Sequence, residues 1–184
     1  SYGEKDLWKS PLTLQILSGD RIRIAGNNGA GKTTLIKMIM SDLKASVGEV
    51  YIADCRTLYI DQEYSIIDGQ LTVFEQVQRF NDRHLVEHEL KMLLHHYQFP
   101  SGVWAKKCDS LSGGEKMKLL LCCITISTNS PDLLILDEPT NNLDMYSLEI
   151  LTNTVSKFEG TILVISHDEN FVNDIQVDRT IILS

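Results

Sequence analysis

The order of polar and apolar side chains over residues 21–43 predicts a strand, a loop and a helix. Residues 21–25 alternate polar and apolar side chains, as a half-buried strand does. Residues 26–31 are rich in glycine and asparagine, and residues 32–43 then carry apolar side chains at helical spacing. The pattern therefore predicts a strand that runs through a glycine loop into a helix.

The second half contains two continuous apolar runs, residues 133–136 and 161–165, of the kind expected for strands covered on both faces. The segment between them has a helical pattern over residues 145–158, which predicts a crossover helix joining parallel strands. Two further short segments are strand candidates, and three others are helix candidates: 48–52 and 57–60 for strands, and 72–81, 84–97 and 112–126 for helices.

These elements predict one α/β domain over residues 1–184, with a mostly parallel sheet and an inserted helical subdomain. The core is expected at about residues 1–65 and 130–184, and the helical subdomain at about residues 66–129. A chain of 184 residues is long enough for one core and needs no second one.

Composition narrows the function classes. The net charge of −8 disfavours a broad nucleic-acid footprint, and no apolar run approaches the roughly 18 residues that would suggest a membrane span. The four cysteines form no metal-like pair, so reduced and mostly buried thiols are expected. The sequence opens without a methionine or a secretion signal, so we expect a cytoplasmic protein and a piece of a longer chain.

Residues 26–33 match the pattern G-x-x-x-x-G-K-[ST], in the expected position between a strand and a helix. In this loop backbone N–H groups turn inward around phosphates, Lys32 reaches the β- and γ-phosphates, and the Thr33 hydroxyl suits Mg²⁺. The loop predicts that the chain binds ATP and Mg²⁺. The residues expected to bind the nucleotide are Asn28, Gly29, Ala30, Gly31, Lys32, Thr33 and Thr34.

Two acidic residues follow the apolar run at 133–136, which places both carboxylates at the carboxyl end of a buried strand. Open α/β sheets bind their ligands at that edge. Asp137 is expected to hold Mg²⁺, and Glu138 to act as the general base that activates the attacking water.

The segment Leu111-Ser-Gly-Gly-Glu115 resembles the signature sequence of the ATP-binding cassette (ABC) family, and it lies between the two motifs above. A serine hydroxyl and glycine N–H groups at a helix start form an anion site. The resemblance implies that Ser112, Gly113 and Gly114 cover the ATP held by a second cassette, so that two cassettes form two composite ATPase sites. The partner cassette would lie in the same parent chain or in a second copy.

Other positions resemble further motifs of that family. Gln62 resembles the Q-loop glutamine, which implies a catalytic role beside Mg²⁺, and His167 resembles the switch histidine at the γ-phosphate. Asp144 resembles the D-loop aspartate, which communicates across the dimer. Tyr2, with Trp8 as a substitute, stands where the family keeps an aromatic residue that stacks on adenine.

The string from Asp137 to Asp144 is similar to that of the ABC-F subfamily, whose members carry two cassettes and no transmembrane domain. Asn142 and Glu169 depart from that pattern, and residues 62–112 leave no room for the arm found in many first cassettes, which favours a second cassette. The resemblance implies action on the ribosome, in translation or antibiotic resistance, through other parts of the parent protein. The alternative is the motor domain of a transporter, docked on transmembrane domains.

One competing pattern implies different chemistry. Residues 84–88 match H-x-x-E-H, in which two histidines one helical turn apart bind zinc in a peptidase. The surrounding leucines instead favour an ordinary amphipathic helix with its histidines on the polar side.

Overall fold

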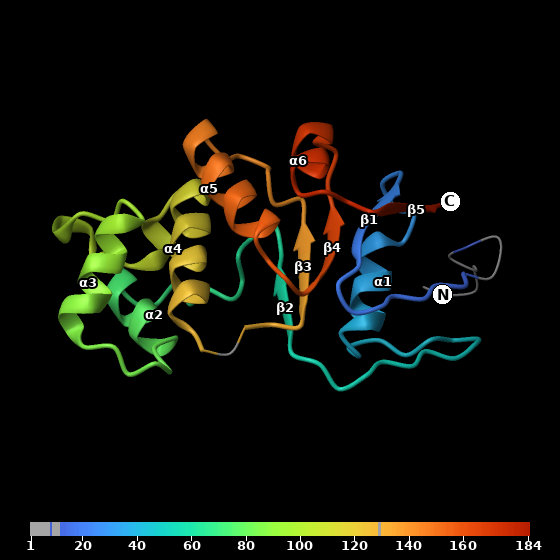
Figure 1. Cartoon of the computed structure of the whole chain (residues 1–184), viewed down its shortest axis with the longest axis horizontal. Coiled ribbons are helices and arrows are strands. Elements are labelled where there is room, and N and C mark those ends of the chain that lie inside the picture. The colour runs from blue at the N-terminus through green and yellow to red at the C-terminus, as the bar shows by residue number, and fades with distance from the viewer. Residues whose placement is uncertain (1–7, 9–11, 129) are drawn as a thin grey trace. The chain divides into compact units, whose positions relative to one another are not determined.

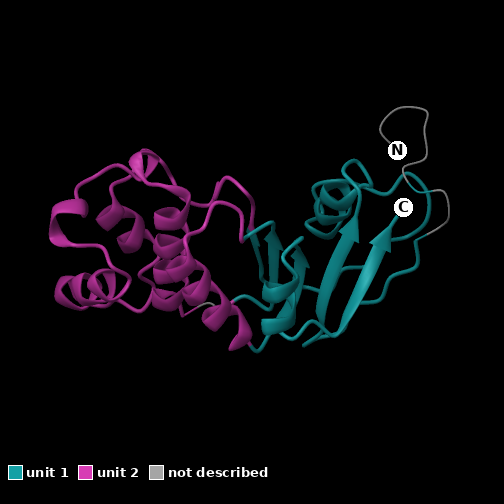
Figure 2. Ribbon diagram, turned by 90° about the horizontal axis from the view of Figure 1, so that it is seen from above, with its two compact units in different colours: residues 1–59, 131–139, 159–184 teal, residues 60–130, 140–158 magenta. Residues whose placement is uncertain are grey.

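A computed structural model of the chain describes residue 8, residues 12–128 and residues 130–184 (Figure 1). The chain divides into two compact units (Figure 2). Unit 1 consists of Ser1–Tyr59, Pro131–Pro139 and Glu159–Ser184, and unit 2 of Ile60–Ser130 and Thr140–Phe158. Residues 140–158, which the sequence pattern places with the strands, group with the helical unit.

Unit 1 is built on a five-stranded sheet in the order β2-β3-β4-β1-β5. The pairs β1–β4, β1–β5 and β3–β4 are parallel. The strands are β1 (Arg21–Gly26), β2 (Thr57–Ile60), β3 (Leu133–Asp137), β4 (Thr161–Ile165) and β5 (Arg179–Leu183). The structure therefore confirms the α/β class and the mostly parallel sheet.

The core of unit 1 forms because alternate strand residues point to the same face of the sheet. Ile22 and Ile24 of β1 lie in one buried cluster with Ile135 of β3 and Leu163 of β4. Helix α1 (Lys32–Ile39) adds Leu35 and Ile36 to this cluster. The start of α1 is thereby fixed against the sheet, directly after the glycine loop.

Unit 2 is helical. Its elements are α2 (Val73–Arg79), α3 (Glu87–His96), the short 3₁₀ helices Ser101–Val103 and Cys108–Ser110, α4 (Gly113–Ile126) and α5 (Met145–Ser156). Helix α4 contacts α2, α3 and α5. Eight of its fourteen residues are buried, so it forms the centre of this unit.

The thiols of unit 2 are buried, as the sequence predicts. Cys108, Cys122 and Cys123 are free and buried. Burial raises the pKa of Cys108 to about 11 and that of Cys122 to about 12, because an apolar surrounding disfavours the thiolate.

No helix in the described ranges is long and apolar enough to cross a membrane.

The prediction of a strand at residues 48–52 is wrong. This segment is irregular, and the side chains of Val50 and Tyr51 are 50% and 93% exposed. Its β-branched and aromatic residues favour a strand, but strand propensity needs a neighbouring strand to pair with. Two elements of unit 1 lacked a clear signal in the sequence: α6 (Glu169–Asp174) and β5.

Candidate functional site

The glycine loop and its motif at residues 26–33, here called the phosphate loop, lie at one edge of the sheet together with Asp137, Glu138 and His167. Strand β1 ends at Gly26 and β3 ends at Asp137, and β4 lies between these two strands. Asp137 is in register with Ile165, two residues before His167. Because these strands are parallel, their carboxyl ends meet at the same edge, which is where open α/β sheets bind ligands.

The phosphate loop requires glycine at its first position. Gly26 has a φ of +153°, and a Cβ there would lie 2.6 Å from the carbonyl oxygen of Leu183 on β5. Any other residue would push β5 away from the loop. After this turn Asn28, Gly29 and Thr33 are exposed, so these positions of the loop are accessible from solvent.

Lys32 lies across this loop. Its Nζ donates hydrogen bonds to the carbonyl oxygens of Gly26, at 2.7 Å, and of Asn27, at 3.4 Å. The ammonium group is therefore held at the mouth of the loop by weak neutral acceptors. Phosphate oxygens are stronger acceptors for an ammonium, since their bonds are charge-assisted.

Trp8 supports the loop through the backbone of Ala30. Its Nε1 donates to the carbonyl oxygen of Ala30 at 2.9 Å, and its ring packs against the core cluster of unit 1. The sequence suggested Trp8 only as a substitute for an adenine-stacking residue. Tyr2, the first choice for that role, lies outside the described residues.

Asp137 is 8% exposed and is oriented by a tyrosine on the neighbouring strand. The hydroxyl of Tyr59 on β2 donates to Asp137 Oδ2 at 3.1 Å. Sequence reasoning missed Tyr59, because nothing in a four-residue strand pattern marks its hydroxyl as a partner of a distant carboxylate. The Asp137 carboxylate and the Thr33 hydroxyl are oxygen donors of the kind that Mg²⁺ prefers, so the residues fit this ion.

Glu138 and His167 form a pair. Their Oε1 and Nε2 atoms lie 3.3 Å apart, with the glutamate side chain 11% exposed and the histidine side chain 71% exposed. Glu138 has a φ of +50°, which costs backbone energy in a residue with a side chain. Its N–H donates to the carbonyl oxygen of Ile165 at 2.8 Å, which ties it to the end of β4. The strained backbone holds this carboxylate at the edge where the phosphate loop opens.

Arg23 braces the segment that carries His167. Its Nε donates to the carbonyl oxygen of Ser166 at 3.1 Å, and its Nη2 lies 2.7 Å from Glu169 Oε1. The hydrogen bond and charge of this guanidinium lower the pKa of Glu169. Glu169, which departs from the subfamily pattern, therefore has a partner in this chain.

The remaining predicted residues lie in unit 2. Gln62 is exposed near its start. Ser112 caps α4: its Oγ accepts from the N–H of Glu115 at 3.3 Å, and Glu115 Oε2 accepts from the N–H of Ser112 at 2.8 Å. Asp144 caps α5 by accepting from the N–H of Ser147 at 2.7 Å. Unit 2 thus brings the signature segment and the Asp144 segment to two capped helix starts.

The zinc pattern does not have the geometry that it needs. Helix α3 begins at Glu87, and His84 lies before it with a φ of +54°. His84 and His88 are therefore not placed one turn apart on a single helix, as the peptidase motif requires.

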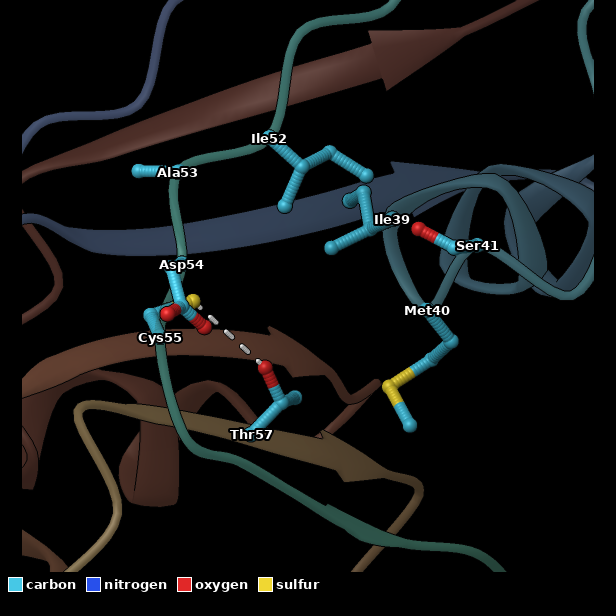
Figure 3. Close-up of a pocket in the computed structure, with 8 residues that line it drawn as sticks. All are labelled: Ile39, Met40, Ser41, Ile52, Ala53, Asp54, Cys55 and Thr57. Atoms are coloured by element: carbon cyan, nitrogen blue, oxygen red, sulfur yellow. Dashed lines mark hydrogen bonds between the residues drawn. The ribbon is translucent and has the colours of Figure 1, made fainter.

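A separate pocket of about 310 Å³ lies in unit 1, between the end of α1 and the irregular segment before β2 (Figure 3). Cys55 Sγ lies 3.7 Å from Thr57 Oγ1 inside it. None of the predicted nucleotide-binding residues lines this pocket, so the pocket is not the candidate nucleotide site.

Comparison with known proteins assigns a family to this arrangement. The profile described as "ABC transporter" matches residues 10–141. The ATP-binding protein Uup of Caulobacter vibrioides is 33% identical over 182 residues, which cover 94% of this chain and 29% of that protein. The ABC transporter F family member 5 of Arabidopsis thaliana is 36% identical over 98% of this chain and 26% of its own length. The chain thus spans under a third of these relatives.

Solved structures agree on the fold. The dimeric structure of MJ0796, a bacterial ABC transporter cassette, has a TM-score of 0.73 at 24% identity, covering 98% of this chain and 88% of that one. The archaeal ribosome recycling factor aABCE1, solved in complex with ribosomal stalk protein aP1, has a TM-score of 0.68 at 26% identity. That match covers 90% of this chain and 32% of the solved one.

Proposed function

Because this chain belongs to the ATP-binding cassette family of ATPases, we propose that it hydrolyses Mg-ATP at composite sites formed by two cassettes head to tail. The observation that carries the proposal is the Glu138–His167 pair, held 3.3 Å apart at the edge of the sheet where the phosphate loop opens. A carboxylate held in a strained backbone beside a phosphate-binding loop is placed for base catalysis.

In this mechanism the residues of unit 1 bind the phosphates, hold the metal ion and activate the attacking water. Lys32 and the N–H groups of the loop bind the phosphates, while Thr33 and Asp137 hold Mg²⁺. The ion, when bound, neutralises charge that develops on the phosphate oxygens. Glu138 accepts a proton from water as the water oxygen bonds to the γ-phosphorus and the bond to the β–γ bridging oxygen breaks. His167 orients the carboxylate of Glu138.

The second cassette is expected to meet the exposed start of α5. Ser112 and Asp144 are exposed, and the next two residues, Met145 and Tyr146, are 87% and 45% exposed. Large apolar side chains next to exposed polar ones are common at interfaces between proteins. The dimeric state of the MJ0796 cassette supports a second cassette as the partner of this chain.

A test is the dependence of ATP turnover on chain concentration. We expect turnover per chain to rise as the concentration is raised through the dimerisation range, because a site formed by two cassettes needs both. Light scattering at the same concentrations reports the assembly state. Full turnover by a chain that stays monomeric throughout would contradict a composite site.

We place this cassette in the ABC-F subfamily, acting in the cytoplasm on the ribosome, in translation or in antibiotic resistance. The relation to an F family member and the likeness to a ribosome recycling factor support this role. The test is co-sedimentation with ribosomes of the protein at its full natural length, carrying Glu138→Gln and supplied with ATP. We expect ATP-dependent pelleting, and recovery in the supernatant under every nucleotide condition would contradict the role.

A further inference from the structure

The starts of α4 and α5 approach each other closely inside unit 2. A Cβ on Gly114 would lie 3.1 Å from Ser147 Oγ, 3.5 Å from Asp144 Oδ2 and 3.7 Å from Ser147 Cβ. A Cβ on Gly113 would lie 4.0 Å from the carbonyl oxygen of Asn142. Both glycines of the signature segment therefore lie against residues 142–147.

Ser147 is the tightest point of this contact. The residue is 0% exposed, and its Oγ finds no hydrogen-bond partner among the described residues. A buried hydroxyl without a partner lowers the stability of a fold. Hydrogen bonding of this hydroxyl therefore does not explain why residue 147 is a serine. The small size of the side chain does, because a small side chain lets the backbone of α4 come close.

The same residue is bonded to Asp144. The N–H of Ser147 donates to Asp144 Oδ1 at 2.7 Å, and this hydrogen bond lowers the pKa of Asp144. Ser147 thus contacts Gly114 through its side chain and fixes the Asp144 carboxylate through its backbone N–H. Movement of Gly114 would disturb the cap of α5, because both depend on Ser147.

We propose that Ser147 is a positioning residue that fixes the signature segment against the Asp144 segment, so that both face a second cassette as one rigid block. The proposal rests on the composite sites of the proposed function. Packed interiors change between discrete arrangements and do not deform continuously, so a block of this kind would engage or release the second cassette as a whole. The size of residue 147 sets its geometry.

The test uses the 184-residue chain carrying Glu138→Gln, in which ATP is bound and not consumed. The dimer dissociation constant is measured by sedimentation at saturating Mg-ATP, and ATP affinity is measured by calorimetry. Adding Gly114→Ala or Ser147→Val is expected to weaken the dimer about tenfold or more, because overpacking at a tight contact displaces the helices. In the Ser147→Val variant, the ATP affinity of the monomer, measured below the dimerisation range, should stay unchanged, since the phosphate loop lies in unit 1.

The double change Gly114→Ala with Ser147→Ala is the decisive variant. It removes the oxygen that the new Cβ would meet at 3.1 Å and leaves only the ordinary contacts at 3.5 Å and 3.7 Å, so the dimer should regain most of its strength. Ser147→Ala alone should dimerise as the parent does. Ser156→Val, at the far end of α5, is the matched control and should also behave as the parent.

Two results would overturn the proposal: a double variant that dimerises as weakly as Gly114→Ala, or a Ser147→Val variant that dimerises like the parent. If the parent carrying Glu138→Gln forms no dimer with ATP, the proposed function fails and this inference fails with it. If the parent dimerises with ATP and only the Gly114 and Ser147 variants dimerise weakly, the weakening arises at this contact and leaves the proposed function intact.

Discussion

Replacing Glu138 with glutamine is expected to lower ATP turnover by about a thousandfold, which is the usual contribution of a general base. The amide keeps the size of the side chain but accepts no proton from water. ATP affinity should change little, because the phosphates are held by Lys32 and the loop. The measurement is steady-state phosphate release, with calorimetry for affinity.

The matched control is Glu159→Gln. Glu159 is exposed and lies two residues before the start of β4, whereas Glu138 follows the end of β3. In a parallel sheet these positions lie at opposite edges. The control should keep the parent rate, and a Glu138→Gln variant that also keeps it would show that another group removes the proton.

Replacing Lys32 with alanine is expected to weaken Mg-ATP binding by about a hundredfold, because a charge-assisted bond to phosphate is lost. The loop also loses the bonds from Nζ to the carbonyl oxygens of Gly26 and Asn27. Binding of a fluorescent ATP analogue measures the effect.

Lys37→Ala is the control for this change, because Lys37 is an exposed lysine in the last turn of the same helix. Its removal should leave ATP affinity at the parent value. Equal affinity of the Lys32 variant and the parent would mean that the nucleotide binds elsewhere, and the phosphate loop would lose its assignment.

The elements that carry the candidate phosphate site could be predicted from the sequence. The glycine loop between a strand and a helix specifies its own backbone, and a buried parallel strand places Asp137 at the ligand-binding edge. The apolar runs of β3 and β4 predicted strands covered on both faces, and every residue of both strands is buried. These predictions succeed because each motif is local in the sequence and because parallel strands have their carboxyl ends at the same edge of the sheet.

The contacts that support the site could not be predicted in this way. The bonds from Tyr59 to Asp137 and from Trp8 to Ala30 join residues that are distant in the sequence and carry no motif. The approach of Ser147 to Gly114 depends on how two helices pack. The mistaken strand at residues 48–52 has a related cause, since pairing partners decide whether a segment with strand propensity forms a strand.

The exposed features of unit 2 explain why one cassette is expected to need another. Ser112 and Asp144 sit at two helix starts that face solvent, and a helix start binds anions through its free N–H groups. In the proposed mechanism, unit 1 supplies a phosphate loop, a base and a histidine for its own ATP. The signature segment of unit 2 is the part that, in the proposed mechanism, serves the ATP of a second cassette.

Sedimentation of the Glu138→Gln chain, with and without saturating Mg-ATP, tests this account most directly. We predict a monomer without nucleotide and a dimer with ATP that binds two nucleotides and dissociates when the ATP is removed. A chain that binds one ATP with full affinity and stays monomeric at every concentration would contradict the composite site.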